Sequence, residues 1–266
     1  MELAIITWDV NPEIFRIGGF APRWYGVLFA SGFLFGYFIF KRMFRNEGLR
    51  DELLDKLTIY SALGTIIGAR LGHCLFYEPS YYLSNPLEIL MIWKGGLASH
   101  GAAIGILLAL WLFVRKEKKP YMWILDRIVI VAALAGALIR LGNLMNSEIY
   151  GIETTLPWGF VFLRNGETVP KHPTQLYEAL AYFIVFFILF RIYWRKKGDF
   201  IRGLTFSLFL ILVFVFRFFV EFVKEDQVAF EAGMKFNMGQ WLSLPFVLIG
   251  VIILVYSLQK HRRKVE

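Results

Sequence analysis

The chain has 266 residues, 57% of them hydrophobic and 18% aromatic, and a formal net charge of +8. A soluble domain has roughly 45–50% apolar residues, so the composition excludes an ordinary soluble fold. The basic residues follow apolar runs, which excludes a nucleic-acid surface as their main role. The single cysteine, Cys74, excludes an intramolecular disulfide.

Seven apolar segments, taken in chain order, are each near the roughly 20 residues that cross about 30 Å of hydrocarbon. They cover residues of about 25–40, 55–77, 97–114, 123–142, 174–194, 203–223 and 239–258. No linker or repeat divides the chain. We therefore predict an all-α membrane protein with one integral-membrane domain over residues 1–266, a polytopic bundle of about seven transmembrane helices whose outer-side loops form a small head region.

The basic residues are unequally divided between the two sides that these segments define. One side carries 18 of the 29, namely Lys41, Arg42, Arg45, Arg50, Lys56, Arg115, Lys116, Lys118, Lys119, Arg191, Arg195, Lys196, Lys197, Arg202, Lys260, Arg262, Arg263 and Lys264. The other carries seven, namely Arg16, Arg23, Lys94, Arg164, Lys171, Lys224 and Lys235. Because cytoplasmic loops carry the excess of Lys and Arg, we predict an outer N-terminus and a cytoplasmic C-terminus.

Small residues and outer loops give further expectations. Glycines recur at four-residue spacing at Gly64, Gly68, Gly72, Gly101 and Gly105. This spacing lets helix backbones approach closely, so it predicts tight helix packing. The longer outer loops cover about 78–96 and 143–173, and the second contains residues that suit turns or a short hairpin. A third outer segment, about 224–238, is polar.

Six ionisable side chains fall inside the apolar segments, in the outer half of five different ones: Arg70, His100, Arg140, Glu178, Arg217 and Glu221. A charge at the bilayer centre costs about 2.5–3.5 kcal/mol on insertion scales, so such groups are rare and usually functional. Their similar depth predicts a polar cavity between the helices.

For each of these residues, a purely structural role is an alternative to a functional one. Arg217 and Glu221 share a helix face and could form a structural ion pair. Arg140 could be a helix-end residue that reaches the interface, and His100 a satisfied polar core residue. Together, however, the arginines offer planar forks suited to a phosphate, and a histidine can move a proton near neutral pH. The set predicts phosphoester or acyl-lipid chemistry at the outer leaflet. The chain has no G-x-S-x-G, no H-E-x-x-H and no paired aspartates for a divalent metal.

Several ordered motifs resemble those of one known family. Residues 140–151 are similar to the signature R-x-G-N-F-x-N-x-E-x-x-G of phosphatidylglycerol–prolipoprotein diacylglyceryl transferases. The resemblance extends over nearly the whole chain, through residues 23–26, 68–77, 95–105, 172–178 and 217–222. The chain departs from the family pattern at Ile139, Leu144, Ala102, Ala103 and Val213. These departures affect the expected shape of the lipid pocket and not the expected function.

The resemblance implies an activity in the bacterial cytoplasmic (inner) membrane. A diacylglyceryl group would pass from phosphatidylglycerol to the thiol of the lipobox cysteine in a preprolipoprotein signal peptide. A thioether would form and glycerol phosphate would leave, with no metal or other cofactor. The implied partners are phosphatidylglycerol, the preprolipoprotein and membrane lipids, with no nucleic acid.

The resemblance also implies roles for particular residues. Arg140 and Arg217 would hold the phosphate, and His100 is the candidate base for the thiol. The expected substrate-binding residues are Tyr25, Arg70, Tyr77, Asn143, Asn146, Glu148, Gly151, His172, Gln175, Glu178 and Glu221.

Two alternatives from other classes remain open at this point. A transporter or lipid flippase would line a pathway with charges through both halves of the membrane. Here the inner half is sparse, with Asp126 and Arg127 near the cytoplasmic edge. A purely structural scaffold would leave the cost of the buried charges unexplained.

Overall fold

The structure, a computed structural model, describes residues 5–225 and 233–265, except for the side chains at positions 94, 264 and 265. The α-helices in this part are α1 (Trp24–Asn46), α2 (Asp51–Phe76), α3 (Pro79–Ser84), α4 (Ser99–Lys116), α5 (Tyr121–Met145), α6 (Thr174–Lys196), α7 (Leu204–Val220) and α8 (Met238–Val265). All except α3 are long and apolar enough to cross a membrane, α7 together with the short 3-10 helix η4 (Glu221–Val223). The prediction of a seven-span helical membrane protein is confirmed.

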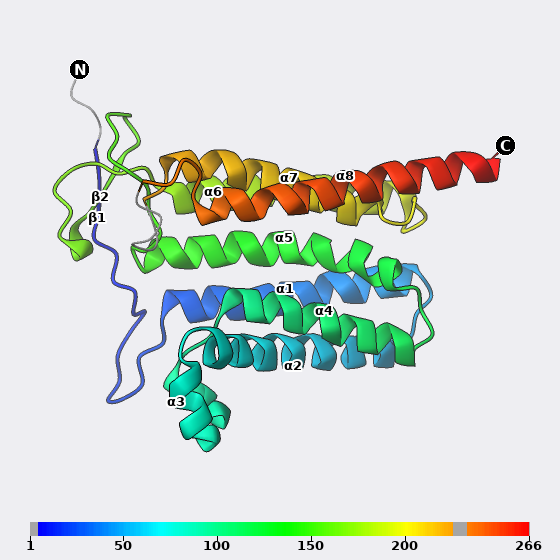
Figure 1. Cartoon of the computed structure of the whole chain (residues 1–266), viewed down its shortest axis with the longest axis horizontal. Coiled ribbons are helices and arrows are strands. Elements are labelled where there is room, and N and C mark those ends of the chain that lie inside the picture. The colour runs from blue at the N-terminus through cyan, green and yellow to red at the C-terminus, as the bar shows by residue number, and fades with distance from the viewer. Residues whose placement is uncertain (1–4, 226–232, 266) are drawn as a thin grey trace. The chain divides into compact units, whose positions relative to one another are not determined.

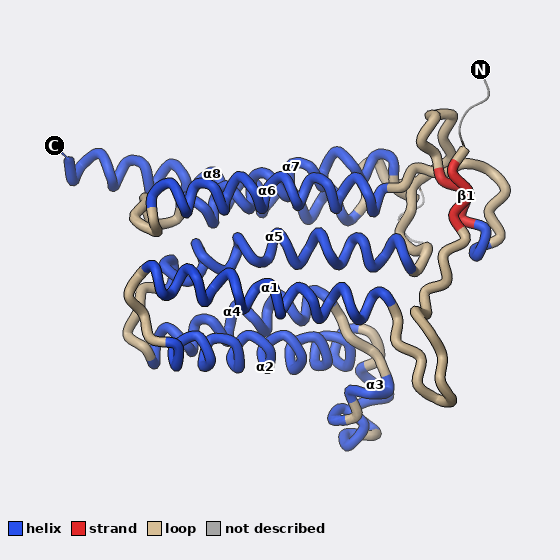
Figure 2. Tube along the Cα trace, turned by 180° about the vertical axis from the view of Figure 1, so that it is seen from behind, coloured by secondary structure: helices blue, strands red, loops and turns tan. Residues whose placement is uncertain are grey.

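Contacts divide the chain into two compact units. Unit 1 comprises residues 1–39 and 126–266, and unit 2 comprises residues 40–125. Within unit 2, α2 and α4 lie side by side, and α3 leaves them sideways at the end of α2 (Figure 1). Within unit 1, the short strands β1 (Ile6–Trp8) and β2 (Phe160–Phe162) lie beyond the helix ends (Figure 2). The prediction of one domain over the whole chain stays a prediction.

The glycines of α2 and α4 bring the two backbones of unit 2 into direct contact. A Cβ atom added at Gly68 would lie 2.4 Å from the carbonyl oxygen of Gly101. One added at Gly105 would lie 2.1 Å from the carbonyl oxygen of Gly64. No side chain fits at either position, so the predicted close packing of glycine-spaced helices is confirmed.

Gly105→Ala is expected to destabilise the protein by about 1–3 kcal/mol, because the new methyl group meets backbone that cannot move aside without separating the helices. Gly26→Ala is the matched control, since a Cβ there meets no atom within 4 Å. The midpoint of thermal unfolding in detergent should fall for the first variant only. Equal midpoints for both variants would mean that the contact of α2 with α4 tolerates a side chain.

The helices of unit 1 pack as a series of neighbours. A Cβ added at Gly32 of α1 would lie 3.2 Å from Ala135 of α5, and one at Gly136 of α5 would lie 3.1 Å from Tyr182 of α6. Helix α7 contacts both α6 and α8. The start of α7 is capped by Asp126 of α5, whose carboxylate accepts hydrogen bonds from Gly203 N at 2.6 Å and Phe206 N at 3.0 Å. A buried carboxylate at the positive end of a helix satisfies donors that the helix itself cannot.

A small head region is built from the loop after α5 and the N-terminal segment. Strand β1 pairs with β2 in parallel, from Ile6 opposite Phe160 to Trp8 opposite Phe162. The Trp8 indole donates to Leu144 O at 3.0 Å, and Leu144 and Phe162 belong to one buried cluster. The loop was predicted to hold turns or a short hairpin. Phe160 and Lys171 do exchange two backbone hydrogen bonds, at 2.9 and 2.8 Å, but the strand pairs with the N-terminal segment.

Lys171 ties the head region to the segment after α7. Its Nζ lies 2.7 Å from a Glu225 carboxylate oxygen, 3.6 Å from Glu167 and 4.0 Å from Glu153. The hydrogen bond to Glu225 raises the pKa of the Lys171 ammonium above its ordinary value, so the group stays charged. Two carboxylates of the loop after α5 and one of the segment after η4 thus converge on one cation. The predicted third outer segment lies partly outside the described residues.

Candidate active site

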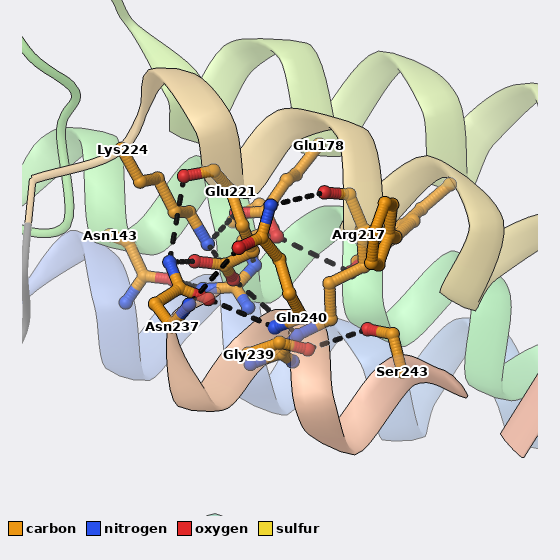
Figure 3. Close-up of polar contacts among 12 residues, drawn as sticks. Asn143, Glu178, Arg217, Glu221, Lys224, Asn237, Gly239, Gln240 and Ser243 are labelled. Atoms are coloured by element: carbon orange, nitrogen blue, oxygen red, sulfur yellow. Dashed lines mark hydrogen bonds and ion pairs between the residues drawn. The ribbon is translucent and has the colours of Figure 1, made fainter. Parts of the chain in front are cut away.

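A continuous chain of ion pairs crosses unit 1 (Figure 3). Arg140 Nε lies 3.1 Å from Glu178 Oε2, which lies 3.2 Å from Lys224 Nζ. That ammonium lies 3.1 Å from Glu221 Oε1, and Arg217 Nε lies 3.5 Å from the same oxygen. These five side chains, the ion-pair chain, come from α5, α6, α7, η4 and the residue after η4.

The ion-pair chain confirms part of the sequence prediction. Arg140, Glu178, Arg217 and Glu221 lie in one connected cluster, as their similar predicted depth required. Within these five side chains three cations meet two carboxylates, and Asn143 links Arg140 to a third carboxylate, Glu148.

The two arginines differ in how far they are committed to protein partners. Arg140 also donates from Nη1 to Asn143 Oδ1 at 3.2 Å, and its side chain is 15% exposed. Arg217 Nε lies at ion-pair distance from Glu221 but makes no hydrogen bond to the described residues, and the side chain is 32% exposed. A partly exposed planar guanidinium suits a phosphate.

A third carboxylate, Glu148, is held beside Arg140 by amides. Its Oε1 accepts from Asn143 Nδ2 at 2.8 Å and from Asn146 Nδ2 at 3.2 Å. Asn143 therefore bridges Arg140 and Glu148. Tyr25 packs on the same part of α5, since a Cβ at Gly142 would lie 2.8 Å from its ring. The structure brings these five predicted site residues together.

The turn that carries Glu148 is strained and held by side chains. Ser147 and Ile149 both have positive φ, 55° and 62°, a conformation that is an outlier for a β-branched residue. Three consecutive carbonyl groups, of residues 147, 148 and 149, accept from Asn165 at 2.7 Å, Gln175 at 2.7 Å and Thr174 at 2.8 Å. Such strain persists only where surrounding groups enforce it, and it clusters at functional sites. Gln175, predicted to bind substrate, uses its amide nitrogen to hold this turn.

Gly151 and His172 are likewise engaged with backbone and neighbouring side chains. A Cβ at Gly151 would lie 2.1 Å from Val223 O and 2.8 Å from His172 Cβ, so only glycine fits there. His172 Nδ1 lies 3.2 Å from the Tyr177 hydroxyl, which accepts from the Trp158 indole at 2.9 Å. Burial lowers the pKa of the His172 imidazole, which favours its neutral form.

Sequence reasoning missed two members of the site. Lys224 was counted only as an outer-side basic residue, yet its side chain is 3% exposed within the ion-pair chain. Its position three residues after Glu221 and seven after Arg217 is the signal that could have found it. Asn237, at the start of α8, donates to Glu221 Oε2 at 3.1 Å. The Glu221 carboxylate also lies against Gly239 of α8, where an added Cβ would be 2.5 Å from the carboxyl carbon.

In unit 2, Arg70 holds the loop segment that follows α3. Its guanidinium donates to Glu88 O and Gly95 O at 2.6 Å each and to Ile89 O at 2.9 Å. Arg70 also lies 5.0 Å from the centre of the Tyr82 ring. Most of its donors therefore serve the loop through the 3-10 helices η1 (Pro86–Leu90) and η2 (Ile92–Lys94). This geometry supports a structural role for Arg70. Its predicted contact with substrate stays a prediction.

His100 and Tyr77 lie together in unit 2. His100 is in the first turn of α4, and its ring centre lies 5.8 Å from that of Tyr77 and 5.4 Å from that of Phe76. Tyr77 also stacks on His73 at 5.6 Å. Two predicted site residues are thus neighbours, and the exposed His100 imidazole has two aromatic rings beside it. Among residues 5–225 and 233–265, no group of three His, Cys, Asp or Glu side chains could hold a metal ion.

The fold and the charged cluster define the class of protein: a multi-pass membrane protein with a cluster of ion pairs among its helices. Residues 12–256 match the family model described as prolipoprotein diacylglyceryl transferase. The chain belongs to this family, whose members are transferase enzymes.

Relatives match almost end to end. A phosphatidylglycerol–prolipoprotein diacylglyceryl transferase of Tolumonas auensis is 49% identical over 260 residues, which cover 97% of this chain and 100% of the relative. The enzyme with the same name in Porphyromonas gingivalis is 45% identical, covering 96% of each chain. That of Chloroherpeton thalassium is 44% identical, covering 96% of this chain and 95% of its own. The family inferred from the sequence motifs is confirmed.

Proposed function

We propose that this chain transfers the diacylglyceryl group of phosphatidylglycerol to the lipobox cysteine thiol of preprolipoproteins in the bacterial inner membrane. The observation that carries the proposal is the ion-pair chain of unit 1, in which Glu178 and Glu221 each hold one arginine. The partly exposed guanidinium of Arg217 suits a lipid phosphate. Asn143 at the end of α5, with Asn146 and Glu148 after it, would contact the polar head group.

The reaction is a displacement at carbon. The cysteine sulfur forms a bond to the glyceryl carbon that carries the phosphate, and the bond from that carbon to the phosphate oxygen breaks. Glycerol phosphate leaves with the bonding electron pair, and the thiol proton passes to a base. Arg140 and Arg217 would stabilise the charge that grows on the leaving phosphate. His100 is the proposed base, because the thiolate is the nucleophile and imidazole accepts protons near neutral pH.

A transporter that moves lipid would need charged groups along its whole path. The ionisable residues of the inner half have structural partners instead. Asp126 caps the start of α7, and Arg127 Nη2 lies 3.4 Å from Gly198 O. This assignment of the inner charges favours the enzyme over the transporter.

The proposal is tested by incubating purified protein with radiolabelled phosphatidylglycerol and a lipobox peptide. The label is placed in the glyceryl carbons of the diacylglyceryl part, because base removes the ester-linked acyl chains. We expect the peptide to keep this glyceryl label after treatment with base, as a thioether does. A peptide with serine in place of the lipobox cysteine is the control and should stay unlabelled. Equal labelling of both peptides, or of neither, would contradict the proposed acceptor.

Orientation in the membrane follows from the 18-to-7 division of basic residues and is proposed as an outer N-terminus and a cytoplasmic C-terminus. In a Cys74→Ser background, Thr168→Cys should react with an impermeant thiol reagent added outside, and Lys118→Cys only after the membrane is broken. Both positions are exposed in the structure. The opposite labelling pattern would place the charged cluster on the cytoplasmic side.

A further inference from the structure

Lys224 occupies the centre of the ion-pair chain. Its ammonium lies 3.2 Å from Glu178 Oε2 and 3.1 Å from Glu221 Oε1, and its side chain is 3% exposed. A lysine is almost never buried to this extent unless it is paired. Neither carboxylate is free to serve Lys224 alone, because Glu178 also holds Arg140 and Glu221 also holds Arg217.

The two carboxylates need a cation between them. Their side chains are 0% and 5% exposed, so water can do little to screen their charges. The other groups that face them here are neutral: the Tyr182 hydroxyl lies 3.5 Å from Glu178 Oε1, and Asn237 Nδ2 donates to Glu221 Oε2. Without Lys224, the two negative charges would repel each other in a poorly solvated place. The carboxylates would then move apart and hold the two arginines at a different spacing.

We infer that Lys224 is a positioning residue that sets the spacing between Arg140 and Arg217 and thereby the shape of the phosphate site. This inference rests on the proposed function, in which both arginines bind the phosphate. Lys224 acts through the carboxylates and not on the substrate, because its ammonium is buried between Glu178 and Glu221. One ammonium pairs with two carboxylates, each of which also lies at ion-pair distance from an arginine, so the positions of these groups depend on one another.

The first test is Lys224→Met, which keeps the length of the side chain and removes its charge. We expect kcat/KM for phosphatidylglycerol to fall by about 10²-fold, the loss that a small misplacement of reacting groups causes. KM for the lipobox peptide should not change, because the inferred role of Lys224 concerns the site of the lipid phosphate and not that of the peptide. Lys235→Met is the matched control, an exposed lysine of the segment before α8, and should behave as the wild type.

The second test adds Glu221→Gln to Lys224→Met. The double substitution removes one positive and one negative charge, so the ion-pair chain regains its single excess positive charge. The amide introduced at position 221 would keep a carbonyl oxygen for Arg217. We expect the double variant to regain about tenfold in kcat/KM over Lys224→Met, as expected for strongly coupled neighbours. A direct phosphate ligand would give no such recovery.

The possible outcomes distinguish a positioning role of Lys224 from the alternatives. Unchanged kcat/KM in Lys224→Met, or losses that simply multiply in the double variant, would overturn the inference. If Lys224→Met does not fold, the double variant is expected to fold, and failure of both contradicts the inference as well. Affinity for phosphatidylglycerol in mixed micelles is measured alongside transfer. A wild type that binds this lipid but transfers nothing would refute the proposed function, while the affinities of the variants still test the role of Lys224.

Discussion

Arg217→Lys is expected to lower kcat for transfer by about 10²–10³-fold, the loss typical of removing one donor to a developing negative charge. The arginine lies at ion-pair distance from Glu221, and its side chain is 32% exposed, so part of the guanidinium can meet another partner. A lysine has a single ammonium that cannot hold Glu221 and offer a planar fork to a phosphate at the same time. The net charge is unchanged, so the protein should still insert and fold. Arg140→Lys should show the same pattern, because Arg140 is paired in the same way to Glu178.

The measurement is single-turnover transfer by purified variants of matched thermal stability. Arg164→Lys is the control, since Arg164 is exposed in the head region. Near-normal turnover in Arg217→Lys would mean that the residue contributes charge or packing alone. In that case the ion-pair chain would have a structural role only, which its burial also allows.

His100→Gln is expected to keep phosphatidylglycerol binding and to lose about 10²–10⁴-fold in transfer, the usual contribution of a positioned base. A free thiol has a pKa of about 8.5 and is mostly protonated at pH 7. Without the base, activity should therefore recover in part as the pH rises toward that value. His261→Gln, near the end of α8, is the matched control and should transfer normally.

The competing role for His100 is a contact with a head group or with its aromatic neighbours Tyr77 and Phe76. That role predicts weaker lipid binding or a lower unfolding midpoint, with no rescue by pH. Lipid affinity and the pH–rate profile of His100→Gln separate the two roles. Weak binding with an unchanged profile would remove the base assignment and leave the transferase intact.

The sequence predicted the membrane helices and their polar residues well, because both depend on local patterns. A run of about 20 apolar residues has few structural alternatives to a membrane-spanning helix. The pairing of Arg217 with Glu221 and of Arg140 with Asn143 followed from spacings of four and three residues on a helix. The glycine spacing similarly predicted the direct contact of α2 with α4.

The features that sequence reasoning missed depend on contacts between distant segments. Ile6–Trp8 pairs with Phe160–Phe162, and no local pattern in a three-residue strand indicates its partner. Lys224 looked like one more basic loop residue, because its second carboxylate, Glu178, comes from another helix. Arg70 was identified because a charged side chain within a membrane segment is energetically costly. The carbonyl groups that accept its hydrogen bonds lie 18 to 26 residues further along the chain.

The most direct test of the account is the stoichiometry of the two products. Phosphatidylglycerol labelled with one isotope in the diacylglyceryl part and another in the head-group glycerol is incubated with the purified protein and a lipobox peptide. The account predicts that each peptide-bound diacylglyceryl group is matched by one released glycerol phosphate, and that both products fall together in Arg217→Lys. Release of glycerol phosphate without labelled peptide, or fatty acyl label on the peptide without the glyceryl carbon, would contradict it.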